Sequence, residues 1–254
     1  MKQYIAFLKK EIIESIHMYK LLIMLIVFLI FGVMSPIIAK LTPYFIGTLM
    51  PEGSVITLPD PSALDSWIQF FGNITQMGLM VMMIVFSSSL GSEIAKGTLI
   101  NMLTKGLARK VVILSKYTCM AFIWTISIIF SFLVTLGYTV YLFPNGGIVN
   151  LLFSIFCLWL FGMLLLALLV FASTLINTSY GSLLIVGSTV VVFMVLNIIF
   201  NFNKYNPLLL STKNVDLLTN NIAVSSLYGA IGITLVLMIV FIVLSILIFR
   251  KKQL

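Results

Sequence analysis

The chain has 254 residues, of which 61% are hydrophobic and 9% are charged, whereas soluble domains carry about 25% charged residues. This composition excludes an ordinary soluble domain and indicates an all-α integral membrane protein, because lipid leaves the open edge of a sheet unsatisfied. The formal net charge is +8, and the positions of the charges decide what that excess means.

The first twenty residues favour an amphipathic helix that lies at a membrane surface. Apolar side chains at Ile5, Leu8, Ile12, Ile16 and Tyr19 recur at helical spacing, while the charged residues occupy other faces. Such a helix buries its apolar face at the headgroup boundary. The alternative is a solvated extension that simply continues the first membrane span.

Six apolar stretches follow, and most reach the roughly 20 residues that a helix needs to cross a bilayer core. The predicted spans are Leu21–Ala39, Ile68–Leu90, Tyr117–Leu142, Leu151–Ile176, Ser182–Phe200 and Leu227–Phe249. Prolines between the first two spans, at Pro43, Pro51, Pro59 and Pro61, predict turns there rather than a long helix. Trp67 is expected to anchor the second span at the outer headgroups. Cys119 and Cys157 fall inside spans and are expected to be free and buried.

The charges predict the orientation. With the N-terminus in the cytoplasm, the inner segments hold twelve basic residues: Lys2, Lys9, Lys10, Lys20, Lys96, Lys105, Arg109, Lys110, Lys116, Arg250, Lys251 and Lys252. The outer segments hold three: Lys40, Lys204 and Lys213. This bias is typical of cytoplasmic loops, so both termini are expected on the cytoplasmic side of the membrane, and the positive charge requires no nucleic acid partner.

The residues also argue against several activities. The 87 residues from Tyr117 to Asn203 contain no Asp, Glu, Lys, Arg or His, whereas an ion-driven carrier usually needs an ionisable group in the membrane. Catalytic acids, histidines and metal ligands are missing from the spans, and no G-x-x-x-x-G-K-[ST] phosphate loop occurs. We therefore expect no enzyme activity and no cofactor in this chain, and any ATP and magnesium would be bound by a partner subunit.

The most distinctive segment is the loop Gly91–Lys116, GSEIAKGTLINMLTKGLARKVVILSK. It predicts a short helix bracketed by Gly97 and Gly106, with Ser92 as the residue that caps its start. Arg109 and Lys116, taken alone, could serve only to fix the topology of the chain. Glu93 is different, because an acidic residue does not help to keep a loop on the cytoplasmic side.

This loop resembles the first cytoplasmic loop of permease subunits in type-2 ABC exporters, as does the opening F-L-K-K-E at Phe7–Glu11. The resemblance implies a single domain over residues 1–254, with an interfacial helix at 1–20, a six-span bundle at 21–249, a coupling loop at 91–116 and a cytoplasmic tail at 250–254. It also implies a cytoplasmic coupling helix between spans 2 and 3 that docks on an ATPase subunit. The matching positions are Glu93, Gly97, Thr98, Leu99, Leu103, Thr104, Lys105, Arg109 and Lys116. Gly106 departs from the pattern, since proline is common there.

The resemblance implies a permease half that pairs with an identical or paralogous half and is driven by the ATPase subunit. Glu93 would cap the coupling helix or anchor it to a basic group of the partner. The character of the chain is similar to that of permeases from Gram-positive bacteria that export amphipathic peptides, such as phenol-soluble modulins. Drugs, lipids and glycans are the alternative substrates, and a secondary carrier or a membrane scaffold or sensor are the alternatives from other classes.

Overall fold

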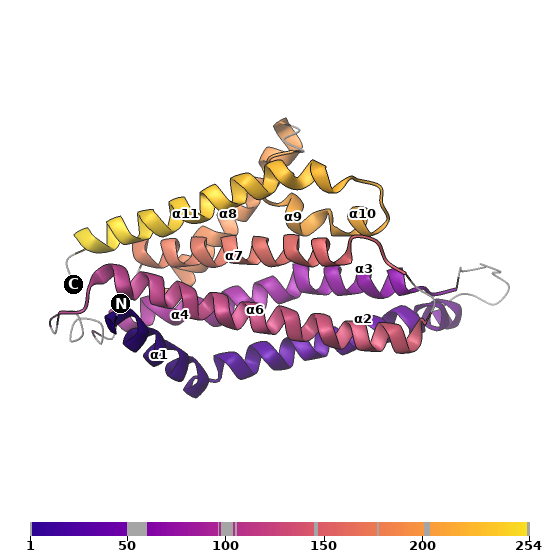
Figure 1. Cartoon of the computed structure of the whole chain (residues 1–254), viewed down its shortest axis with the longest axis horizontal. Helices are drawn as coiled ribbons and strands as arrows, with labels where there is room; N and C mark the ends of the chain where they lie inside the picture. The colour runs from indigo at the N-terminus through magenta and orange to yellow at the C-terminus, as the bar shows by residue number, and fades with distance from the viewer. Residues whose placement is uncertain are drawn as a thin grey trace.

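The computed structural model describes residues 2–49, 60–95, 97, 104, 106–144, 147–176, 178–200 and 204–252. Every secondary-structure element in these ranges is helical, and six helical segments are long and apolar enough to cross a membrane. The predicted all-α, multi-pass architecture is confirmed. Figure 1 shows the long helices running side by side, with both termini at the same end of the bundle.

The long helices occur in chain order, with shorter ones between them. The elements are α1 (Lys2–His17), α2 (Lys20–Leu49), α3 (Ala63–Asn73), the π-helix η1 (Ile74–Gly78), α4 (Leu79–Ala95), α6 (Arg109–Leu142), α7 (Leu151–Leu175), α8 (Ser179–Phe200), α9 (Leu209–Thr212), α10 (Asn214–Leu218), the 3-10 helix η2 (Val224–Leu227) and α11 (Tyr228–Lys251). Together α3, η1 and α4 make the second span.

The first span was predicted to end at Ala39, but α2 continues to Leu49 and contains both Pro36 and Pro43. The prediction that Pro43 lies in a turn is wrong, and Pro51 and Pro59 lie outside the described residues. Proline at position 36 removes the N–H that would bond to the carbonyl of Gly32. The Thr135 hydroxyl of α6 donates to that carbonyl at 3.2 Å instead, so a neighbouring helix satisfies the group that proline frees.

The helix of the second span extends past Leu90, the predicted inner end of that span. Helix α4 continues to Ala95, so Ser92 lies inside a helix and does not cap the start of another. At the opposite end of this span, Trp67 is almost fully buried and its ring packs against those of Phe70 and Phe132. The expected headgroup anchor is therefore part of the core, because α3 turns this side chain toward α6.

The core is centred on α7. In the most apolar stretch of this helix 72% of the residues are buried, against 11% in the corresponding stretches of α8 and α11. Helices α6 and α7 approach closely where the Trp124 ring of α6 packs against Gly162 of α7. A Cβ at this position would lie 2.4 Å from the indole ring. Trp124 is fully buried and its Nε1–H donates to the Trp159 carbonyl at 3.1 Å. Cys119 and Cys157 are free and buried, as predicted.

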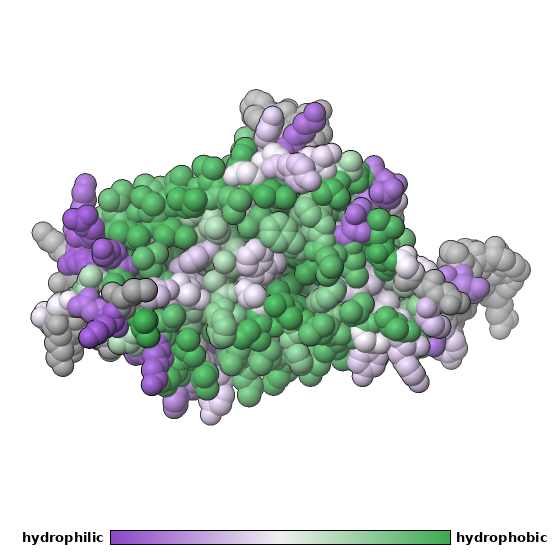
Figure 2. Space-filling model, viewed as in Figure 1, coloured by the Kyte–Doolittle hydropathy of each residue, from purple (hydrophilic) through white to green (hydrophobic). Residues whose placement is uncertain are grey.

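Figure 2 shows a broad apolar surface around the middle of the bundle, with hydrophilic residues gathered at the end that carries both termini. Between α8 and α11, the short helices α9 and α10 pack against α7 through buried side chains that include Leu209, Leu210 and Leu217. The segment between α8 and α11 is therefore largely folded onto the bundle.

Candidate functional site

The candidate site lies where α1 meets the ends of α4 and α6. Helix α1 is separate from the first span, because Met18 and Tyr19 form a turn between them and Tyr19 has φ 57°. Figure 1 shows α1 turning sharply away from α2. The structure thus contradicts a simple continuation of the first span. Phe7, Glu11 and Ser15 recur every four residues and form the buried face of α1.

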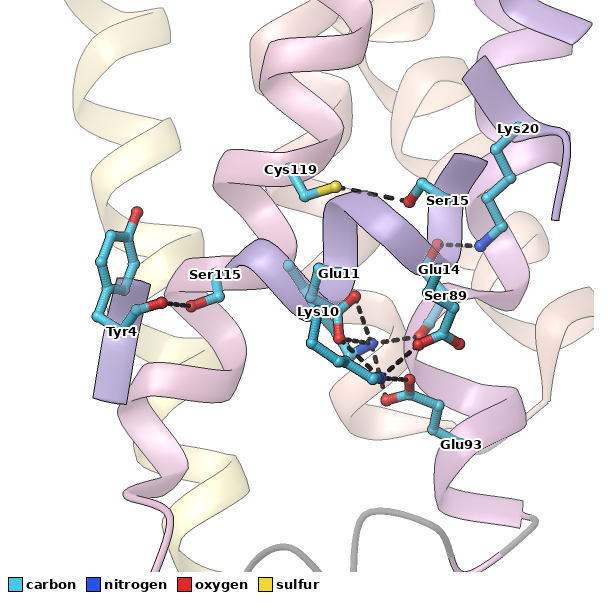
Figure 3. A network of polar contacts seen from close by, with 11 residues as sticks. Tyr4, Lys10, Glu11, Glu14, Ser15, Lys20, Ser89, Glu93, Ser115 and Cys119 are labelled. Atoms are coloured by element: carbon cyan, nitrogen blue, oxygen red, sulfur yellow. Dashed lines mark hydrogen bonds and ion pairs between the residues drawn. The ribbon is translucent and has the colours of Figure 1, made fainter. Parts of the chain in front are cut away.

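An ion cluster that includes Glu11 of α1 and Glu93 of α4 (Figure 3) has Lys116 of α6 at its centre and joins the three helices. Its side chain is 2% exposed. Its ammonium lies 3.0 Å from both carboxylate oxygens of Glu11 in α1 and 2.7 Å from Oε2 of Glu93 in α4. It also donates to the Ser89 carbonyl at 2.8 Å. Every N–H of this buried ammonium therefore has an acceptor, which is the condition for burying a charge.

A second lysine closes the cluster from α1. The Lys10 ammonium lies 2.7 Å from Oε1 of Glu93 and 3.2 Å from Glu11, and it also pairs with Glu14. Lys20, at the start of α2, donates to the Ser89 hydroxyl at 2.9 Å. With Lys116, the three lysines balance the three glutamates, so the group as a whole carries no net charge.

The pKa values of the cluster reflect this pairing. Burial opposes ionisation of Glu93, but the charge of Lys116 and the hydrogen bonds from Lys10 and Lys116 hold its pKa below the ordinary carboxyl value. Burial likewise opposes the charge on Lys10, yet its hydrogen bonds to Glu14 and Glu93 raise its pKa above the ordinary value. Both groups are therefore charged at neutral pH, and the cluster is a set of ion pairs.

The three carboxylates raise the question of a metal site, because Glu11, Glu14 and Glu93 each place an oxygen within 4.8 Å of the others. The ammonium groups of Lys10 and Lys116 contact these same carboxylates. Two fixed cations compete with any divalent ion, so the arrangement is suited to holding helices together.

Arg109, the first residue of α6, joins that helix to the C-terminal end of the chain. Its Nη1 donates to the carbonyls of Phe249, Arg250 and Lys252 at 2.8, 3.1 and 2.6 Å. The last carbonyls of a helix have no partner within it, and a cation there is favoured by the helix dipole. Lys252 in turn donates to the Thr174 carbonyl near the end of α7 at 2.8 Å.

The structure brings some of the sequence-predicted residues together. Glu93 and Lys116 share the ion cluster, whereas Arg109 belongs to the separate contact with α11. Thr104 is exposed. Thr98, Leu99, Leu103 and Lys105, and with them the centre of the predicted coupling helix, lie outside the described residues.

Gly97 and Gly106, which bracket the predicted coupling helix, both have left-handed backbones, with φ 69° at Gly97 and 89° at Gly106. Proline fixes φ near −65°, so it could not adopt the conformation of residue 106. The departure from the family pattern at Gly106 therefore has a local structural reason, and the Gly106 carbonyl accepts a hydrogen bond from Gln3 of α1 at 3.2 Å.

The sequence prediction missed the α1 side of the cluster. Glu11 was noted only as part of F-L-K-K-E, and Lys10, Lys20 and Ser89 were not assigned to a site. The signal that could have found Glu11 is its four-residue spacing from Phe7 and Ser15, which places it on the inward face of α1.

Among known proteins, no family model matches the chain. No curated protein matches it either.

Proposed function

We propose that this chain is the membrane-spanning half of a type-2 ABC exporter in a bacterial cell membrane, with both termini in the cytoplasm. A separate ATPase subunit would bind and hydrolyse ATP with magnesium. Support comes from the six spans, from the placement of both termini and the loop at one end, and from the loop pattern that includes Glu93, Gly97 and Arg109.

The observation that carries the proposal is the ion cluster. The loop leaves the membrane after α4 and re-enters at α6, and the cluster joins Glu93 of α4 and Lys116 of α6 to Glu11 of α1. A force on the loop would therefore reach α1 as well as the second and third spans. ATP binding would shift the transporter only if the ATPase contacts the loop differently in the two states.

This reading assigns different roles to the loop residues. Glu93 and Lys116 are buried, so they would act by holding the helices that flank the loop. Residues 98–105 would supply the surface that docks on the ATPase subunit, and α1 would lie at the inner surface of the bilayer. Arg109 would keep the start of α6 attached to α11.

A second permease half, identical or paralogous, would cover the face of η1 and α4. Gln76 is the fourteenth of 27 residues in the second span, and its side chain is exposed there beside Met77 and Met80. An amide that faces lipid at mid-depth is unfavourable. A partner half that packs on this face would cover the amide or leave it beside a pathway.

The substrate we propose is an amphipathic peptide, with drugs, lipids or glycans as alternatives. Support comes from the long charge-free stretch from Tyr117 to Asn203 and from the adaptable methionines near Gln76. Uptake of a fluorescent amphipathic peptide into inverted vesicles would test this, and transport of a lipid analogue but not of the peptide would contradict it.

The class is tested by co-purification and by a paired substitution. An ATPase subunit should co-purify with the chain, and abolishing ATP hydrolysis should stop export. A secondary carrier would continue to export without the ATPase, and a scaffold or sensor would bind a partner without exporting anything.

In the paired variant Glu93→Ala with Arg109→Ala, transport-coupled ATPase activity should fall while membrane insertion persists. Lys110→Ala, at an exposed neighbour of Arg109, is the matched control. ATPase activity that is unchanged in the paired variant would remove Glu93 and Arg109 from the coupling role.

A further inference from the structure

Charges are segregated at the end of the bundle that carries both termini. The three acids described there, Glu11, Glu14 and Glu93, all pair with Lys10 or Lys116 inside the cluster. The exposed cations are Lys2, Lys9, Lys110, Arg250 and Lys251. Within the described residues, the salt bridges found include none of these five. This surface is therefore positive without local compensation.

Two of these cations lie on an outward stripe of α1. Lys2, Ile5, Lys9, Ile13 and Ile16 follow one another at intervals of three or four residues, which places them on one face. All five are exposed, Ile5 by 61% and Ile16 by 50%. The outward face of α1 thus combines isoleucine with lysine and carries no acid.

The inward face of α1 is the opposite of a usual helix face. It buries Glu11 and Ser15 beside Phe7, and the cluster fixes this orientation. A helix that buries Glu11 and exposes Ile5, Ile13 and Ile16 is not arranged for water on the outside. It is arranged for a medium that accepts both apolar side chains and lysine ammonium groups.

We propose that the outward stripe of α1 binds the headgroups of anionic phospholipids. The isoleucines would enter the acyl boundary, while Lys2 and Lys9 would extend along it to reach phosphate groups. The proposal rests on the placement of α1 at the bilayer surface in the proposed function, but not on the exporter role. An acidic protein surface could pair with the lysines, but it would leave Ile5, Ile13 and Ile16 without an apolar partner.

A lysine near an anionic leaflet contributes about a fivefold preference over a neutral leaflet, so the pair contributes on the order of 25-fold. The test uses the full chain in micelles that contain equal amounts of phosphatidylglycerol and phosphatidylcholine. Native mass spectrometry then counts the lipids that stay bound. The wild-type chain should retain mostly phosphatidylglycerol, and Lys2→Gln with Lys9→Gln should lose most of this enrichment.

The matched control is Lys40→Gln with Lys213→Gln, which removes two exposed lysines from segments far from α1. It should keep the enrichment, and thermal melting should show that both double variants are folded. Equal enrichment in the wild type and the α1 variant would overturn the proposal, as would equal losses in both variants. The proposal would also be overturned if Lys2→Gln with Lys9→Gln kept the lipid enrichment but no longer retained the ATPase subunit in lipid-free detergent. That result would assign the two lysines to protein binding. Because the experiment measures bound lipid and not export, it tests this proposal even if the chain proves not to be an exporter.

Discussion

Lys116 shows how a single residue can control the fit of three helices. Its ammonium neutralises Glu11 and Glu93 in a nearly closed environment. Removing one partner of a buried pair leaves the other charge uncompensated and typically costs about 3–5 kcal/mol. Lys116→Met keeps much of the side-chain volume but would leave two glutamates facing each other.

We expect Lys116→Met to lower the melting temperature of the purified chain clearly, whereas Lys110→Met, on the exposed side of the same helix, should change it little. The double variant Lys116→Met with Glu93→Gln should recover part of the loss, because it removes one of the two carboxylates that would otherwise share the single ammonium of Lys10. A melting temperature that stays unchanged in Lys116→Met would mean that the cluster contributes nothing to stability.

The same cluster predicts a pH dependence. The lowered pKa of Glu93 means that its contribution to stability is complete above the ordinary carboxyl range and is lost as pH falls through the lowered value. The raised pKa of Lys10 gives the opposite limb, so its contribution is complete below the ordinary lysine pKa and is lost at more alkaline pH.

The melting temperature in detergent should therefore change little between about pH 5 and pH 10, and it should fall at more acidic pH. The groups that face Glu93 are Lys10, Glu11 and Glu14 of α1, Lys20 of α2 and Lys116 of α6. The acidic limb should become shallower in Glu93→Gln, and identical limbs in the two proteins would assign the acid sensitivity to other carboxylates.

At the scale of elements, the crossing of α6 and α7 depends on Gly162. A methyl group there would meet the Trp124 indole, which is buried and hydrogen-bonded and has little room to move. Overpacking of this kind costs about 1–3 kcal/mol. Gly137 of α6 is a matched control, because a Cβ there meets nothing within 4 Å.

Gly162→Ala should lower the melting temperature and Gly137→Ala should leave it equal or slightly higher, since alanine favours helix. Equal effects of the two substitutions would show that the crossing can widen without loss. Differential scanning fluorimetry of the buried tryptophans would report both.

The helical elements were largely predictable, and their details were not. Apolar length alone located the six spans, because a bilayer requires about 20 apolar residues from each helix. Pro43 was misleading because proline usually ends or kinks a helix, and no local pattern shows that α2 continues past it to Leu49. Trp67 was misplaced for a similar reason, since only the packing of α3 on α6 shows which way it points.

The candidate site was predicted in part. The charges of Glu93 and Lys116 stood out in an apolar chain, but their partner Glu11 is about a hundred residues from Lys116. No local pattern encodes that contact. The turn at Tyr19, which sets the angle of α1, also contains no glycine that would have indicated it.

At the scale of the whole molecule, the exposed amide of Gln76 predicts where a second half would pack. If two halves meet over η1 and α4, Met77 of one half lies close to its equivalent in an identical half, or to a paralogous residue. Ile129 of α6 is 50% exposed and also lies within a span, but on a different helix, so it should face lipid.

Cysteine cross-linking in native membranes would test this arrangement. In a background with Cys119→Ala and Cys157→Ala, Met77→Cys should form a disulfide-linked dimer after mild oxidation if two copies of this chain pair as proposed, and Ile129→Cys should remain monomeric. A paralogous half that carries a cysteine at the aligned position should give a mixed dimer instead. A dimer through Ile129→Cys and none through Met77→Cys in either pairing would place the interface on α6 and leave the Gln76 amide to be satisfied in some other way.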